Sequence, residues 1–221
     1  LDRSAIGVHF ASADPAWRPE RVVRTAGISN RRIRIPAGAS GHLETSTGVI
    51  ARAMEVQAFM PHMHLRGAAF RFDRVDAAGA RSTLLDVPRY DFNWQTAYCL
   101  TPALPLPQGT RIHCSARFDN SEANWNNPDP TQTVHWGDQT WDEMMIGYFH
   151  YAVPRGVPLE GKAIAAGDRV ERLFRRFDVN HDGKIEWEET PPRRRELFER
   201  LDRDHDKILT MEEVAGVLLL Q

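Results

Sequence analysis

The spacing of apolar residues changes once along this chain, near residue 153, and this change constrains the fold more than any other feature. Before it, apolar and polar residues alternate in short runs, as over residues 112–118. A period of two is typical of β-strands, and a period near 3.6 is typical of helices. The helical spacing i, i+3, i+4, i+7 follows the change and is carried by Val170, Leu173, Phe174 and Phe177.

Gly-, Asn-, Asp- and Pro-rich segments separate the alternating runs at residues 38–41, 76–79 and 120–130. Many short strands joined by such loops favour an antiparallel arrangement. We therefore expect a mainly β protein: an antiparallel, jelly-roll-like β-sandwich at residues 1–153, a linker at 154–167, and a small α-helical domain at 168–221.

Charge and composition argue against nucleic-acid binding and against a membrane-spanning segment. The formal net charge of the 221 residues is -2, and the arginines are interleaved with acidic residues, so we expect no nucleic-acid partner. No run of ~18 apolar residues is present, so we expect no membrane span.

The segment 178–189 fits the twelve-residue calcium loop of an EF-hand. Gly183 occupies the turn position, and the amphipathic spacing on either side predicts the flanking helices. Ca²⁺ prefers six to eight oxygen ligands, which this spacing supplies. Positions 1, 3, 5, 7 and 12 are filled by Asp178, Asn180, Asp182, Lys184 (through its carbonyl) and Glu189. The alternative is a solvated acidic turn.

A second, less regular loop follows at residues 202–213, so the pattern predicts an EF-hand pair at 168–221. Its sixth position is Lys207, where a positive φ is needed and a side chain costs roughly 1 kcal/mol. We expect Ile185 to pair with Leu209, and the second loop to bind Ca²⁺ more weakly than the first. The alternative is a metal-free structural partner. Its ligands would be Asp202, Asp204, Asp206, the Ile208 carbonyl and Glu213.

A soft-metal site is indicated by His62-Met63-His64 together with Met144. Because side chains alternate along a strand, His62 and His64 point the same way. Imidazole suits copper, and a thioether favours Cu(I). The alternatives are structural histidines and a methionine that fills a gap in the core.

Three segments resemble the copper type II ascorbate-dependent monooxygenases, especially bacterial relatives of peptidylglycine α-hydroxylating and dopamine β-monooxygenases. They are residues 61–67, 120–130 and 141–144. The resemblance implies the C-terminal, O₂-activating copper domain, with copper on His62, His64 and Met144. It also implies an N-terminal copper domain or partner chain that supplies electrons, with residues 1–11 as the last strand of that domain.

The resemblance also bears on the substrate. Tyr148 matches a substrate-side tyrosine of the family and would line the pocket. Peptide-amidating members hold the substrate carboxylate with an Arg and an Asn, and the matching positions here are Met60 and Ile146. We therefore expect a more apolar site and a substrate other than a peptide ending in glycine.

The two cysteines, Cys99 and Cys114, allow either one disulfide or two free thiols. In the copper monooxygenase family a cysteine directly follows the metal-binding methionine and is the usual partner of the cysteine that matches Cys114. That position is Met145 here, so Cys114 lacks its usual partner. Residues 100–111 could return one strand beside the other, and we expect a cross-strand Cys99–Cys114 disulfide.

The sequence thus predicts a copper- and calcium-binding oxidoreductase module that hydroxylates a C–H bond of an unknown small molecule. A disulfide and EF-hands suit a calcium-replete, oxidising space, so we expect a periplasmic, cell-surface or secreted protein. Two alternatives are a non-catalytic extracytoplasmic metal-binding or scaffold subunit and a protein that stores or delivers Cu(I).

Overall fold

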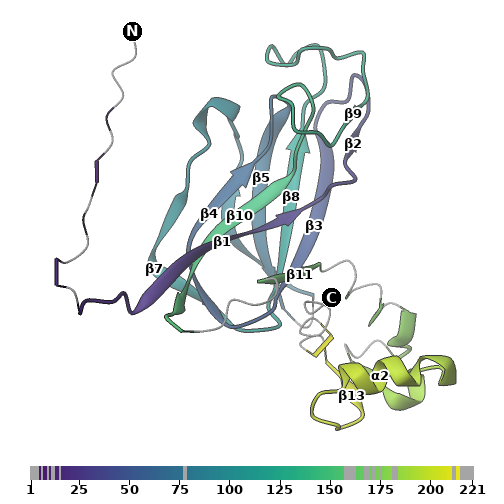
Figure 1. Cartoon of the computed structure of the whole chain (residues 1–221). Helices are drawn as coiled ribbons and strands as arrows, with labels where there is room; N and C mark the ends of the chain where they lie inside the picture. The colour runs from purple at the N-terminus through teal and green to yellow at the C-terminus, as the bar shows by residue number, and fades with distance from the viewer. Residues whose placement is uncertain are drawn as a thin grey trace.

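Two antiparallel sheets form the body of the computed structural model (Figure 1). The structure describes residues 5, 7, 8, 10, 13, 14, 16–76, 79–156, 163–166, 170, 173, 174, 176–180, 184–210, 213 and 214. The four-stranded sheet has the order β1-β10-β4-β7, and the five-stranded sheet has the order β11-β3-β8-β5-β6. The strands are β1 Arg21–Ser29, β3 His42–Ile50, β4 Met54–His62, β5 Gly67–Val75, β6 Arg81–Val87, β7 Tyr98–Leu106, β8 Arg111–Phe118, β10 Ile146–Pro154 and β11 Ile164–Ala166.

The main core lies between these two sheets, so the expectation of a mainly β, antiparallel, sandwich-like fold is confirmed. Phe59 of β4 meets Phe72 of β5 with ring centroids 4.8 Å apart. Gly147 of β10 permits this approach, because a Cβ there would lie 2.6 Å from the Phe72 ring. The alternation at residues 112–118 is confirmed, since its apolar side chains are fully buried in this core.

The predicted Cys99–Cys114 disulfide is wrong. Cys99 is exposed on β7, at the edge of the four-stranded sheet, whereas Cys114 is buried on β8 in the other sheet. The segment between β7 and β8 therefore crosses from one sheet to the other and does not make a hairpin. Both thiols are free, and burial raises the pKa of Cys114 far above its ordinary value.

One end of the sandwich is built from long connections (Figure 1). A turn joins β4 to β5, the short helix η1 Phe92–Trp94 precedes β7, and the long segment between β8 and β10 contains β9 Val134–His135. β9 pairs with β2 Arg34–Ile35. The Asp119 N–H donates to the Arg66 carbonyl at 2.7 Å, so the turn and the long segment lie side by side.

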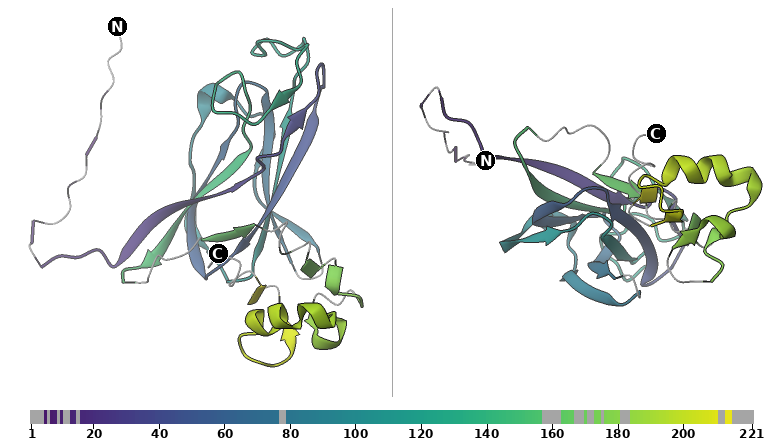
Figure 2. Two further views of the ribbon diagram at one scale, coloured as in Figure 1. Left: turned by 45° about the vertical axis from the view of Figure 1, so that its right-hand side comes forward. Right: turned by 90° about the horizontal axis from the view of Figure 1, so that it is seen from below.

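A second, smaller core belongs to the C-terminal region, which lies below the sandwich in Figure 1 and in the left view of Figure 2. It includes Val170 and Phe174, which are helical, and residues of α2 Arg195–Leu201. α2 is the one α-helix whose bounds the described residues define, so a complete helical domain is not established. The structure also has β12 Ile185–Glu186, β13 Ile208–Leu209 and the short helices η2 Trp187–Glu189 and η3 Pro192–Arg194.

The segment expected to be a linker contains a strand. β11, at residues 164–166, pairs with β3 and forms an edge of the five-stranded sheet. Val49 of β3 is fully buried in the smaller core, so the C-terminal region packs against this strand of the sandwich. Of residues 1–11, four are described, and none of these lies in a strand. No described helix is long and apolar enough to cross a membrane.

Candidate metal sites

His62 and His64 lie together at the loop-rich end of the sandwich. His62 is the last residue of β4, and His64 lies in the turn before β5. Their rings are 5.3 Å apart between centroids and nearly perpendicular. His64 is buried and His62 is half-buried. The two rings thus lie side by side, but His64 lies beyond the end of β4, so strand alternation does not account for this arrangement.

Each imidazole uses its Nδ1 atom in a hydrogen bond with an oxygen. His62 Nδ1 lies 2.5 Å from Gln95 Oε1, and His64 Nδ1 lies 3.2 Å from the Asp142 carbonyl. Gln95 is itself oriented, because its Nε2 donates to the Phe92 carbonyl at 3.1 Å. An oxygen acceptor places the proton on Nδ1 and leaves a lone pair on Nε2. Within the described residues, neither Nε2 atom has a hydrogen-bond partner.

The electrostatic surroundings of His62 favour its neutral form. Burial lowers the pKa of His62 most, the Gln95 hydrogen bond opposes this, and the charge of His64 lowers the pKa further. A neutral imidazole is the form that binds a metal, because the ligating nitrogen must be unprotonated. His62 is therefore suited to be a ligand at neutral pH.

Glu143 connects the histidine turn to the loop that carries Met144. One carboxylate oxygen accepts the N–H groups of His64 (2.8 Å) and Met144 (3.2 Å), and the other accepts that of Arg66 (2.6 Å). Glu143 is fully buried, and this burial raises its pKa to about 7 despite the three donors. A single side chain thus holds the His64 and Met144 backbones together.

Arg66 and Asn120 complete the support beneath this turn. Arg66 is 2% exposed, and its Nε donates to Asn120 Oδ1 while Nη1 donates to the Trp141 carbonyl, both at 2.8 Å. The Asn120 amide donates in turn to the carbonyls of Pro36 and Gln132. No sequence pattern assigned a role to Arg66, Asn120 or Glu143. The acidic residue directly before Met144 was the one available signal.

Tyr148 lies beside the histidines. Its ring centroid is 6.1 Å from that of His62. It lies opposite Met60 across the β4–β10 pair, and Ile146 lies opposite His62. Met60 and Ile146 thus border the histidines with apolar side chains.

The second calcium loop is described at all five predicted ligand positions. Carboxylate oxygens of Asp202, Asp204 and Asp206 lie within 4.8 Å of one another. Asp202 Oδ1 is buried without a hydrogen-bond partner. Such an orphaned oxygen is costly unless a cation meets it, so this donor set fits Ca²⁺. Lys207 has φ 67°, the positive value expected at the sixth position, and its N–H donates to Asp202 Oδ2.

The two loops share a pair of hydrogen bonds to the carboxylate at the twelfth position. In the first loop that carboxylate, Glu189, accepts the N–H groups of Val179 and Glu186 at 2.7 and 2.9 Å. Glu213 accepts those of the matching residues Arg203 and Thr210 at 3.1 and 2.9 Å.

Asp178, Asn180, Lys184 and Glu189 of the first loop are described, and Asp182 lies outside the described residues. The expected pairing of Ile185 with Leu209 joins the two loops through β12 and β13.

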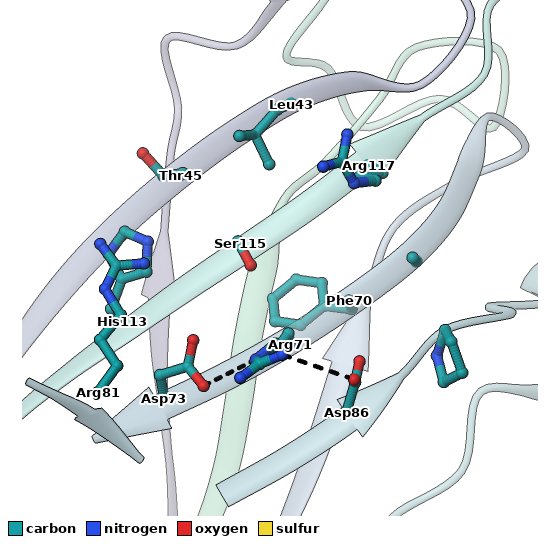
Figure 3. Close-up of a pocket in the computed structure, with 12 residues that line it drawn as sticks. Leu43, Thr45, Phe70, Arg71, Asp73, Arg81, Asp86, His113, Ser115 and Arg117 are labelled. Atoms are coloured by element: carbon teal, nitrogen blue, oxygen red, sulfur yellow. Dashed lines mark hydrogen bonds and ion pairs between the residues drawn. The ribbon is translucent and has the colours of Figure 1, made fainter. Parts of the chain in front are cut away.

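A separate cavity on the sandwich contains none of the predicted metal ligands. It has a volume of about 750 Å³ and lies on the five-stranded sheet, with Ser115 near its centre (Figure 3). Arg71 crosses it between Asp73 (2.8 Å) and Asp86 (3.8 Å). These charges largely neutralise one another, so the cavity does not single out a ligand by charge.

Comparisons with known proteins bear mainly on the C-terminal region. Residues 170–190 match the EF hand family model. No curated protein matches the chain. A structure of the D431N mutant VP2 protein of infectious bursal disease virus, in derived T=1 particles, is 10% identical, with a TM-score of 0.27. That match covers 67% of this chain and 37% of the VP2 chain, and its TM-score is too low to support an argument.

Proposed function

We propose that the sandwich is the O₂-activating copper module of an ascorbate-dependent type of monooxygenase, with a calcium-binding EF-hand pair attached. The observation that carries the proposal is the shared state of His62 and His64. In each residue Nδ1 makes a hydrogen bond with an oxygen, and Nε2 has no hydrogen-bond partner within the described residues. The ring centroids are 5.3 Å apart. His62, His64 and Met144 would hold the copper, which when bound supplies the capacity to bind and reduce O₂.

The chain's own residues have three roles in this proposal. Gln95 and the Asp142 carbonyl orient the imidazoles, and Glu143 keeps the Met144 loop against the His64 turn. Tyr148 lines the site beside His62 and presents its ring to the substrate. Met60 and Ile146 provide no charge at this border, which favours a substrate without a carboxylate at that point.

Electrons for hydroxylation would come from outside the residues described here. The resemblance to the copper monooxygenases implies a second copper domain or a partner chain as their source. A calcium-binding appendage favours an extracytoplasmic location, namely the periplasm, the cell surface or the medium. Calcium would stabilise the C-terminal region by preferential binding to its folded form.

An anaerobic Cu(I) titration against a chromogenic chelator tests the copper assignment. We expect one Cu(I) per chain, with markedly weaker binding in His62→Ala and Met144→Leu. Met60→Leu and His150→Ala are the controls. Met60 lies on β4 with His62, His150 lies on β10, and both are outside the proposed ligand set. The assignment fails if no Cu(I) binds, or if Met144→Leu binds it as tightly as Met60→Leu.

A second candidate, a metal-binding scaffold subunit without catalysis, is favoured by the contact between the smaller core and Val49. Both candidates predict calcium binding, so calcium cannot separate them. Copper binding and O₂ consumption can separate the two candidates. A Cu(I)-loaded chain that reduces no O₂ in the presence of ascorbate and an electron-donating partner domain would favour the scaffold.

A further inference from the structure

A cavity of about 410 Å³ lies next to the segment that carries His64. Leu65, the residue after His64, lines it, and so does Phe92. The Phe92 ring also packs against the His64 ring, with centroids 6.1 Å apart. A molecule in this cavity would therefore lie one side chain away from a proposed copper ligand.

Exposed tryptophans gather in the segments that build this end of the sandwich. Trp125 lines the cavity and is 86% exposed. Trp94, at 72%, directly precedes Gln95, and Trp141, at 61%, directly precedes Asp142. Large aromatic side chains are rarely left so exposed, and Trp125 has this exposure at the wall of a cavity, where an aromatic face can meet a ligand.

Polar groups on the cavity wall restrict what that ligand is. Asp91 and Asp119 outnumber Arg89, so the wall is not basic. Phosphate-bearing nucleic acids and anionic lipid headgroups need a basic surface, and this charge balance disfavours both. The side chains of Arg89 and Asn126 have no hydrogen-bond partner within the described residues, so their donors and acceptors remain available.

A neutral sugar ring matches this combination of aromatic faces and uncommitted polar groups. Its C–H face can stack on an aromatic side chain, while its hydroxyls exchange hydrogen bonds with amide, carboxylate and guanidinium groups. We propose that the cavity, with Trp125 at its mouth, is a binding subsite for a neutral saccharide chain. The saccharide would be the substrate of the monooxygenase only if the proposed function holds. Saccharide binding at this cavity does not depend on that function.

Isothermal titration of the calcium-replete, copper-free chain tests the inference. The probes are the neutral hexasaccharides of β-1,4-linked glucose, N-acetylglucosamine, xylose and mannose, with hexagalacturonate as the acidic counterpart. We expect at least one neutral hexasaccharide to bind, and hexagalacturonate to bind more weakly. Trp125→Ala should weaken binding at least about fivefold. Trp17→Ala removes another exposed tryptophan, which is outside the cavity, and should leave binding unchanged.

The inference is overturned if no neutral hexasaccharide binds at millimolar concentration, if hexagalacturonate binds more tightly, or if Trp17→Ala and Trp125→Ala have equal effects. His62→Ala separates this result from the copper assignment, because it should markedly weaken Cu(I) binding and leave saccharide binding intact. If the chain binds a saccharide but no Cu(I), the proposed copper function is wrong and the saccharide site stands. If it binds Cu(I) but no saccharide, the saccharide site is wrong and the copper function stands. Circular dichroism of each variant verifies its fold.

Discussion

The histidine site and the second calcium loop hold their ligands in opposite ways. The histidine site uses neutral donors from separate segments, and hydrogen bonds to Gln95, Asp142 and Glu143 fix them without any ion. The calcium loop gathers carboxylates of like charge and buries Asp202 Oδ1 without a partner. The first should therefore keep its form when empty, whereas the second should depend on its cation.

The largest expected effect concerns the hydrogen bonds of the histidine site. Glu143→Ala leaves three backbone N–H groups without an acceptor and removes a charge near buried Arg66. We expect the free energy of unfolding to fall by about 3–5 kcal/mol, measured by urea denaturation. Glu55→Ala, which removes an exposed carboxylate paired with Arg21, should produce no measurable change. Equal effects of the two substitutions would show that Glu143 does not support the site.

Removal of calcium should destabilise the C-terminal region and not the sandwich. At a Ca²⁺ concentration of 100 times Kd, binding to the folded form adds about 2.7 kcal/mol, which a chelator such as EGTA removes. We expect faster amide exchange at Ile185 and Leu209 after chelation, with Phe59 and Phe149 unchanged. Removal of copper should change exchange at neither pair. Loss of protection at Phe59 on chelation would contradict the separation of the two regions.

A smaller effect is expected at the sixth position of the second loop. Lys207 holds φ 67°, so Lys207→Gly relieves backbone strain of about 1 kcal/mol and should tighten Ca²⁺ binding about fivefold. Lys184→Gly, where φ is not positive, should give no such gain. Calorimetry of Asp178→Ala and Asp202→Ala tests the predicted ranking of the loops. Equal losses of affinity in these two variants would contradict it.

The smallest expected effect concerns a histidine outside the metal sites. Burial lowers the pKa of His113, and nearby Arg81 lowers it further. Below pH 6.5 the unfolded chain therefore binds a proton at this position more readily than the folded chain, and stability is lost as the pH falls through the folded pKa. His113→Gln should flatten this decline in urea midpoints measured between pH 7.5 and 5. An unchanged slope would show that His113 does not contribute to it.

The contrast between a contiguous calcium loop and a histidine site built from separate segments explains what could be predicted from the sequence. The calcium loops are contiguous, so residue spacing alone predicted the Ile185–Leu209 pair and the positive φ at Lys207. The alternation at residues 112–118 predicted a strand and its buried face. Local patterns of this kind place neighbours within one segment, but they do not say which segments meet.

The missed features all depend on distant segments that meet in space. Gln95 reaches His62 from η1, and Glu143 reaches His64 and Arg66 from the long connection before β10. The disulfide prediction failed for the same reason, because the spacing of Cys99 and Cys114 does not reveal that their strands belong to different sheets. Sheet topology decides these contacts, and no short motif encodes it.

The small strand β11 has a consequence for aggregation. It pairs with the last three residues of β3, Gly48 to Ile50, and so covers that part of the strand's outer edge, next to the core around Val49. An open strand edge offers unpaired N–H and C=O groups to strands of other molecules. A chain cut after residue 154 would expose β3 in this way and should self-associate. The C-terminal region thus protects the solubility of the sandwich, whatever ions it binds.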